Sequence, residues 1–178
     1  FSLPDAFGRH HRLSDYADKP AVLVAFISNR CPFVILIREA LAAFGREYAA
    51  RGLQIIAINS NDGAAHPEET IERIAEEVRT YGYDFPYLKD ASQSVAKAYG
   101  AACTPDFFLF DGHRKLAYHG QFDDARPGNG KDVTGADLRA AVDAVLAGGR
   151  PAERQIPSIG CNIKWEPGNE PPWFSTAA

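Results

Sequence analysis

The unbroken apolar run at residues 21–27 is followed closely by the dipeptide Cys31-Pro32, and this junction restricts the fold more than any other feature of the sequence. An apolar run of this length predicts a buried strand. Proline favours the first helical position, because it has no N–H to lose and its φ is already helical. We therefore expect a strand, a short loop and a helix that begins at Pro32, with Cys31 at the helix N-terminus.

A cysteine at this position is predicted to be reactive. The unpaired amides and the positive dipole end of the helix favour the thiolate over the thiol, and Arg30 adds a neighbouring cation. The pKa of Cys31 should then lie below its usual range. Two plainer interpretations stay open: Cys31 is a small buried hydrophobic residue at a strand end, and Arg30 is a solvated surface charge.

Composition limits the class of protein. The 178 residues, 46% of them hydrophobic, suit one globular domain with an extension. A net charge of −4 with interspersed signs argues against nucleic-acid partners and a membrane surface, and no apolar run reaches the ~20 residues that span a bilayer. We expect a cytoplasmic protein; a periplasmic or secreted one stays open, because the chain begins at Phe1 and contains no methionine.

The three cysteines, Cys31, Cys103 and Cys161, form neither a CxxC pair nor a zinc-binding spacing. An odd number of cysteines does not suit a secreted disulfide framework either. The histidines show no ligand spacing with the cysteines, so no metal site is expected. Redox or nucleophilic chemistry is the leading use of these thiols.

Hydrophobic periodicity and turn residues predict an α/β fold. The predicted elements are a hairpin over 1–13, strands at 21–27, 53–58, 107–110 and 116–118, and helices after Pro32, over 67–81, over 90–100 and after Thr134. Capping boxes are predicted for the last two helices, from Asp90 with Gln93 and from Thr134 with Asp137. This order gives a central mixed sheet with helices on both faces.

The C-terminal segment is predicted to be extended. Residues 150–178 are rich in proline and glycine and have no helical period, which divides the chain into a domain, 1–149, and a tail, 150–178. Within the tail, apolar and polar residues alternate. The apolar positions, Ile159, Cys161, Ile163 and Trp165, should face the domain.

The cysteine junction and a Thr104-Pro105 dipeptide roughly 70 residues later, at the head of an apolar strand, resemble the thioredoxin fold. More closely, the chain resembles the peroxiredoxin-like redoxins related to alkyl hydroperoxide reductase and thiol-specific antioxidant (AhpC/TSA) proteins, in stretches 1–5, 29–33, 99–109, 123–130 and 158–165. The resemblance implies a thioredoxin-like fold, antioxidant activity and a cis peptide bond before Pro105, in a loop that faces Cys31.

Several positions depart from the patterns of these families. Val34 stands where thioredoxin-like reductases carry a second cysteine, which excludes a local disulfide, and Ala25 replaces their buried carboxylate. Ser28 matches the Thr or Ser of peroxiredoxins, but Val24 replaces their proline, and their activating arginine is absent from the strand that begins with Pro105. The peroxidase motif is therefore incomplete.

These residues together predict a thiol-dependent oxidoreductase. Cys31 is the expected nucleophile, with Ser28, Arg30, Thr104 and Pro105 around it. The intermediate would be resolved by Cys103, by Cys161 or by an external thiol, and neither cysteine is preferred. The loop at 123–130 carries Arg126, which either replaces the missing arginine or is an ordinary exposed residue.

The expected substrate is a small-molecule peroxide or a protein disulfide, and the reductant a thiol protein such as a thioredoxin. No bound cofactor is expected, since thiols supply the electrons. A homodimer is left open. The alternatives are a protein disulfide reductase or isomerase, and a catalytically inert thioredoxin-like binding module.

Overall fold

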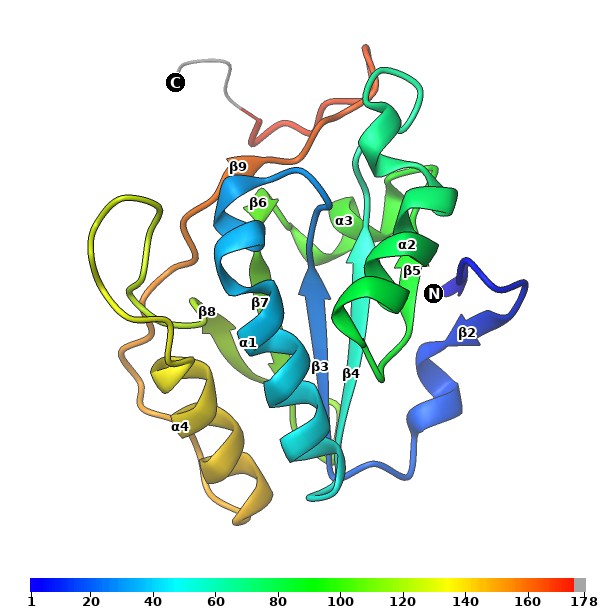
Figure 1. The fold of residues 1–178 in the computed structure, drawn as a ribbon. Coiled ribbons are helices and arrows are strands. Elements are labelled where there is room, and N and C mark those ends of the chain that lie inside the picture. The colour runs from blue at the N-terminus through cyan, green and yellow to red at the C-terminus, as the bar shows by residue number, and fades with distance from the viewer. Residues whose placement is uncertain (175–178) are drawn as a thin grey trace.

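The computed structural model describes residues 1–174 and is built around a five-stranded sheet with the order β5-β4-β3-β7-β8. At its centre β3 (Ala21–Phe26) runs parallel to β4 (Leu53–Asn59) and antiparallel to β7 (Asp106–Phe110). β5 (Tyr87–Lys89) and β8 (Leu116–Gly120) form the two edges (Figure 1). The predicted mixed sheet is confirmed; β5 is an additional short strand.

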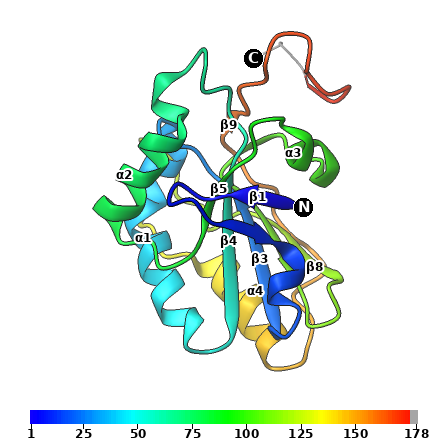
Figure 2. The ribbon, with the colours of Figure 1, turned by 90° about the vertical axis from the view of Figure 1, so that its right-hand side faces the viewer.

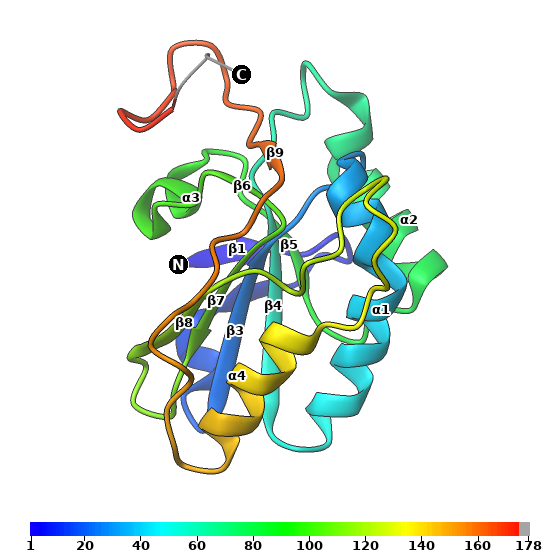
Figure 3. The ribbon, with the colours of Figure 1, turned by 90° about the vertical axis from the view of Figure 1, so that its left-hand side faces the viewer.

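Helices cover both faces of this sheet, as predicted. Three of them, α1 (Pro32–Ala49), α2 (Ile71–Tyr81) and α4 (Ala136–Leu146), lie on one face, and α3 (Ser94–Tyr99) lies on the other (Figures 2 and 3). Every residue of β3 is fully buried. This explains its unbroken apolar sequence, because successive side chains enter opposite halves of the core.

Two short elements flank the sheet at the N-terminal end of the chain. The predicted hairpin is confirmed as β1 (Ser2–Pro4) paired antiparallel with β2 (His10–Arg12). A short 3₁₀ turn, Leu13–Tyr16, follows it and leads into β3. None of the helices within residues 1–174 has the length and apolar character needed to cross a bilayer.

The helix predicted over 67–81 is interrupted. Residues Pro67–Glu69 form a separate 3₁₀ turn, and α2 begins only at Ile71. Between them Thr70 adopts an extended backbone (φ −77°, ψ 162°), which ends the first turn. The break has a consequence for the site, because it turns the Glu69 side chain into the protein interior, where it is fully buried.

Neither predicted capping box forms. The N-cap positions of α3 and α4 are held by Gln93 (φ 63°) and Gly135 (φ 66°), both left-handed and without a capping side chain. Carboxylates outside the helices accept hydrogen bonds from amides at the helix N-termini instead. Asp90 accepts one from the amide of Ala96 at 3.0 Å, and Asp123 accepts one from the amide of Gly135 at 2.7 Å. A carboxylate at another spacing than that of a capping box can also bond to the free amides of a helix N-terminus, and the capping-box pattern does not predict such contacts.

The tail docks on the domain through a short strand. β9 (Cys161–Asn162) pairs antiparallel with β6 (Cys103–Thr104). Ile163 and Trp165 are buried as predicted, but Ile159 is 56% exposed, so the prediction for Ile159 is wrong. The regular alternation begins only where β9 starts, two residues later. Residues 175–178 of the predicted tail lie outside the described residues.

Candidate active site

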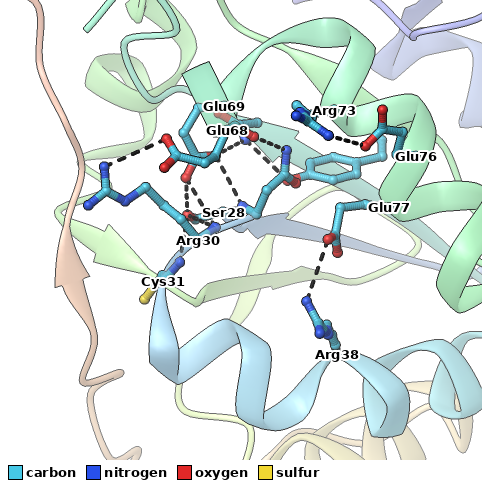
Figure 4. A network of polar contacts seen from close by, with 12 residues as sticks. Ser28, Arg30, Cys31, Arg38, Glu68, Glu69, Arg73, Glu76 and Glu77 are labelled. Atoms are coloured by element: carbon cyan, nitrogen blue, oxygen red, sulfur yellow. Dashed lines mark hydrogen bonds and ion pairs between the residues drawn. The ribbon is translucent and has the colours of Figure 1, made fainter. Parts of the chain in front are cut away.

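Cys31 lies where the sequence predicts it, at the N-terminus of α1. It is the N-cap residue in an extended conformation, with Pro32 in the first turn (Figure 4). Its side chain is only 3% exposed. The helix amides of Val34 and Ile35 bond to the Cys31 carbonyl, at 3.0 and 2.9 Å.

The Thr104-Pro105 turn faces Cys31. The peptide bond between these residues is cis, as predicted, and the Cys31 thiol donates to the Thr104 carbonyl at 3.2 Å. Sheet pairing brings the two together: Phe26, near the end of β3, is the partner of Asp106, the first residue of β7. The residues just outside these strand ends therefore meet above the same edge of the sheet.

Cys161 is the second thiol next to Cys31. The pairing of β9 with β6 places it opposite Thr104, and the two cysteines line the same cavity. Burial alone raises the pKa of Cys31, but hydrogen bonds from the Cys161 thiol, from the Thr104 hydroxyl and from the amides of Cys161 and Val34 outweigh it, so this pKa is lowered. Burial and the bond with Cys31 raise the pKa of Cys161 to about 11.

Cys103 lies apart from this pair. Its thiol is directed at the carbonyls of Pro105 and Ser158, at 3.8 and 3.9 Å. Burial raises the pKa of Cys103 to about 12. The structure thus separates two cysteines that the sequence left equivalent: Cys161 lines the cavity beside Cys31, and Cys103 faces two backbone carbonyls.

A cavity of about 190 Å³ lies beside Cys31. Its walls are mostly polar and include Ser28, Arg30, Asn61, Glu69, Cys161 and Lys164. Drug-sized ligands occupy pockets of roughly 300–1,000 Å³, so this volume suits a small molecule or the end of an extended chain. The predicted residues Ser28, Arg30 and Thr104 all line it, and Pro105 lines a separate, smaller pocket.

Glu69 is the residue that sequence reasoning missed. It is fully buried, and its Oε1 accepts the hydroxyl of Ser28 at 2.5 Å (Figure 4). Ser28 in turn accepts the amide of Cys31 at 3.1 Å. In the sequence Glu69 follows Pro67 at a predicted helix start, where acidic residues are common on the surface, so no signal pointed to burial.

The two arginines considered from the sequence differ in position. Arg30 lines the Cys31 cavity, and its guanidinium lies 3.9 Å from Glu68 (Figure 4) and 2.6 Å from His66. Its charge helps to lower the pKa of Cys161, against the larger effect of burial. Arg126 donates to the carbonyls of Asp123 and Ala125, both at 2.8 Å, and lines the small pocket beside Pro105. It therefore does not reach the Cys31 cavity in this conformation.

Within residues 1–174, no three His, Cys, Asp or Glu side chains lie close enough together to hold a metal ion.

Comparison with known proteins gives a family and a curated relative. The profile of the AhpC/TSA family matches residues 1–119. The thiol-disulfide oxidoreductase ResA of Geobacillus thermodenitrificans (strain NG80-2) is 31% identical over 116 residues, which cover 65% of this chain and 62% of the relative. The chain thus spans about three fifths of the length of the curated relatives it matches.

Among solved structures, a hypothetical protein from Sinorhizobium meliloti 1021 shares 72% identity at a TM-score of 0.93, covering 94% of this chain and 92% of that one. An uncharacterized conserved protein from Geobacillus kaustophilus shares 47% identity at a TM-score of 0.92, covering 94% and 89%. A thioredoxin-like protein from Aeropyrum pernix, at 17% identity and a TM-score of 0.61 over 80% and 88%, shares the fold alone. The predicted thioredoxin-like fold is confirmed.

Proposed function

Because the chain belongs to the AhpC/TSA family, we propose that it is a thiol-dependent oxidoreductase whose nucleophile is Cys31. The observation that carries the proposal is the pairing of two unlike thiols at one cavity. Both cysteines line the cavity, where the pKa of Cys31 is lowered and that of Cys161 is raised. The lower pKa makes Cys31 the more readily ionised of the two thiols, and thiol exchange begins with a thiolate.

A disulfide is the first candidate acceptor. The relative named thiol-disulfide oxidoreductase supports it. The Cys31–Cys161 pair supports it too, since oxidation of two thiols to a disulfide supplies the two electrons that reduce a substrate disulfide. The Cys31 thiolate attacks one sulfur of the substrate disulfide, whose other sulfur leaves as a thiolate and takes up a proton. Cys161 then loses its proton and attacks Cys31. The second substrate thiol is released, and a Cys31–Cys161 disulfide is left.

A small peroxide is the second candidate, and the size of the cavity favours it. Cys31 is 3% exposed and lines a cavity of only about 190 Å³. A cavity of this size admits a small hydroperoxide without any movement of the chain. The thiolate attacks one peroxide oxygen and the other leaves as an alcohol or water, which forms a sulfenic acid on Cys31. Attack by Cys161 then releases water and forms the same Cys31–Cys161 disulfide.

Either route ends in a disulfide that an external dithiol must reduce. A thioredoxin-like reductant is the proposed partner, since it takes the oxidised pair back to two thiols without a bound cofactor. Such regeneration suits a reducing compartment, and we therefore propose the cytoplasm as the location. In this scheme residues 1–149 carry the nucleophile and the tail, 150–178, supplies the resolving thiol.

The acceptor is tested by steady-state assays of the reduced protein with hydrogen peroxide and, separately, with insulin. C31S should abolish both the consumption of peroxide and the reduction of insulin, and the substrate that the parent turns over faster identifies the acceptor. Equal rates for parent and C31S on both substrates would eliminate the enzyme and favour an inert binding module.

The resolving thiol is tested by peptide mass spectrometry after one equivalent of oxidant. The parent and C103S should yield a Cys31–Cys161 disulfide. C161S should instead accumulate sulfenic acid or a mixed disulfide on Cys31. A Cys31–Cys103 disulfide in the parent would assign the resolving role to the other cysteine.

A further inference from the structure

The buried carboxylate of Glu69 is fully occupied by hydrogen bonds. Its Oε1 accepts the Ser28 hydroxyl at 2.5 Å and the Arg30 amide at 3.3 Å. Its Oε2 accepts the Asn29 amide at 3.0 Å and the side-chain amide of Asn59 at 2.7 Å. These four donors use the acceptor capacity of an ionised carboxylate.

Three of the four donors come from consecutive residues, 28–30, that lead directly into Cys31 (Figure 4). Glu69 is 41 residues beyond Ser28 in the sequence, so this is a tertiary anchor and not a local turn. The anchor continues to the nucleophile, because the Ser28 oxygen accepts the backbone amide of Cys31 at 3.1 Å. A chain of contacts thus runs from Glu69 through Ser28 to Cys31.

Glu69 is itself held rigidly. Its backbone carbonyl accepts the ammonium of Lys89 at 2.7 Å, and Lys89 also donates to the carbonyl of Asn61 at 2.6 Å. Burial of a charge is costly unless hydrogen bonds compensate it, and here charge-assisted bonds do so. Loss of the carboxylate would deprive the Ser28 hydroxyl and the amides of Asn29 and Arg30, which are buried or half-buried, of this acceptor.

We propose that Glu69 is a positioning residue, which fixes residues 28–30 through its carboxylate and thereby holds the Cys31 sulfur against Thr104 and Cys161. The proposal rests on the proposed role of Cys31 as the nucleophile. Glu69 acts through Ser28 and is not itself assigned a step in the reaction.

This network also defines the role of Ser28. Its single hydroxyl proton is given to Glu69, so its oxygen serves only as an acceptor toward Cys31. The donors that favour the Cys31 thiolate are instead the Cys161 thiol, the Thr104 hydroxyl and the amides of Cys161 and Val34, whose effect exceeds that of burial. Correct placement of the sulfur relative to these donors is what Glu69 provides.

The substitution E69Q distinguishes a positioning role of Glu69 from a purely electrostatic one, because the two roles predict opposite changes in the alkylation rate of Cys31. Removal of a nearby negative charge by itself favours the thiolate and speeds alkylation of Cys31. Loss of position does the opposite: the glutamine amide group faces N–H donors that it cannot accept, the loop at 28–30 shifts, and the sulfur loses its donors. The proposal therefore requires slower alkylation.

The experiment measures iodoacetamide alkylation of Cys31 in the full chain at pH 6, with the modified peptide quantified by mass spectrometry. We expect E69Q and S28A each to lower the rate about tenfold, as a one-unit rise in pKa would. E72Q removes the charge of an exposed glutamate on α2 and should leave the rate unchanged. In the double variant S28A/E69Q the rate should fall no further than in either single variant, because both act in one chain of contacts.

An E69Q rate equal to or above that of the parent overturns the proposal, as does multiplication of the two effects in the double variant. Circular dichroism checks that each variant is folded; if E69Q does not fold, S28A, which keeps the buried charge, carries the test in the same way. The parent rate compared with that of a free thiol tests the proposed function separately, since the inference depends only on the ratio of variant to parent.

Discussion

At the residue scale, the candidate site brings together two thiols whose pKa values are shifted in opposite directions. Interaction with Cys161 lowers the pKa of Cys31 against the effect of burial, and interaction with Cys31 adds to burial in raising the pKa of Cys161. In the proposed reaction, Cys161 first stabilises the Cys31 thiolate and then attacks the oxidised Cys31.

Removal of the Cys161 thiol should therefore make Cys31 less reactive. We expect C161A to lower the alkylation rate of Cys31 at pH 6 by roughly threefold to tenfold, because a hydrogen bond to a charged group is lost while backbone donors remain. C103A is the matched control, since Cys103 faces the carbonyls of Pro105 and Ser158. An unchanged rate in C161A would show that the backbone alone sets the pKa.

A second residue pair gives a pH dependence of stability. His119 on β8 lies 3.0 Å from the buried carboxylate of Asp106 on β7, and this hydrogen bond raises the pKa of His119 above 6.5. A raised pKa in the folded state means that the stabilisation is complete below the unfolded pKa and is lost as the pH rises through the folded pKa. His119 is 45% exposed on its side chain, so solvent screening limits the effect.

The variant H119Q should accordingly lose up to about 1 kcal/mol of unfolding free energy at pH 5 and less at pH 9. Urea denaturation at the two pH values measures the difference. H10Q changes an exposed histidine on β2 and should lose little at either pH. An equal or larger loss for H119Q at pH 9 would contradict the assignment.

At the element scale, the elements with strong local signals were predictable. The apolar run of β3, the proline at the start of α1 and the periodicity of α4 are local, so the sequence alone indicated them. The short strands β5 and β6 depend on hydrogen bonds to distant residues and have no pattern of their own. For β9, the alternation in the tail indicated an extended segment but not its partner strand. The burial of Glu69 was likewise unpredictable, since it follows from the break at Thr70 and from donors 39 to 41 residues away.

The pairing of β6 with β9 requires a glycine just before β9. A Cβ at Gly160 would lie 1.9 Å from the Thr104 carbonyl oxygen, a distance that no packing adjustment of side chains can relieve. Close approach of two backbones is a known use of glycine. This contact places Cys161 opposite Thr104 and therefore beside Cys31.

The variant G160A should thus separate β9 from β6 and reduce the unfolding free energy by about 1–3 kcal/mol. It should also slow formation of the Cys31–Cys161 disulfide, as followed by mass spectrometry. G149A is the matched control, because a Cβ at Gly149 lies 3.4 Å from the nearest atom and its φ is ordinary. Parent-like disulfide formation in G160A would mean that β9 is not needed to present Cys161.

At the scale of the whole molecule, the C-terminal segment supplies part of the wall of the Cys31 cavity, through Cys161, Asn162 and Lys164. In this segment β9 lies above the N-terminus of α1 (Figure 1). Hydrogen bonds also hold the backbone after β9. The carbonyl of Lys164 accepts the backbone amide of Asp62 at 2.8 Å and the side-chain amide of Gln93 at 2.9 Å. Access to Cys31 is therefore linked to the stability of this docking.

Ile163 and Ile159 allow this link to be tested with one chemical change at two places. Ile163 is 2% exposed in the core behind β3, whereas Ile159, on the other side of Cys161, is 56% exposed. I163A should lower the unfolding free energy by about 2–4 kcal/mol, since it leaves a cavity, and I159A by less than about 0.5 kcal/mol.

Local opening of the tail costs less free energy than global unfolding, so I163A should also expose Cys31 more often. Alkylation by a bulky maleimide, relative to iodoacetamide, should then rise in I163A and stay unchanged in I159A. If I163A lowers stability without raising this ratio, the tail does not control access, and the bulky reagent reaches Cys31 through the existing cavity.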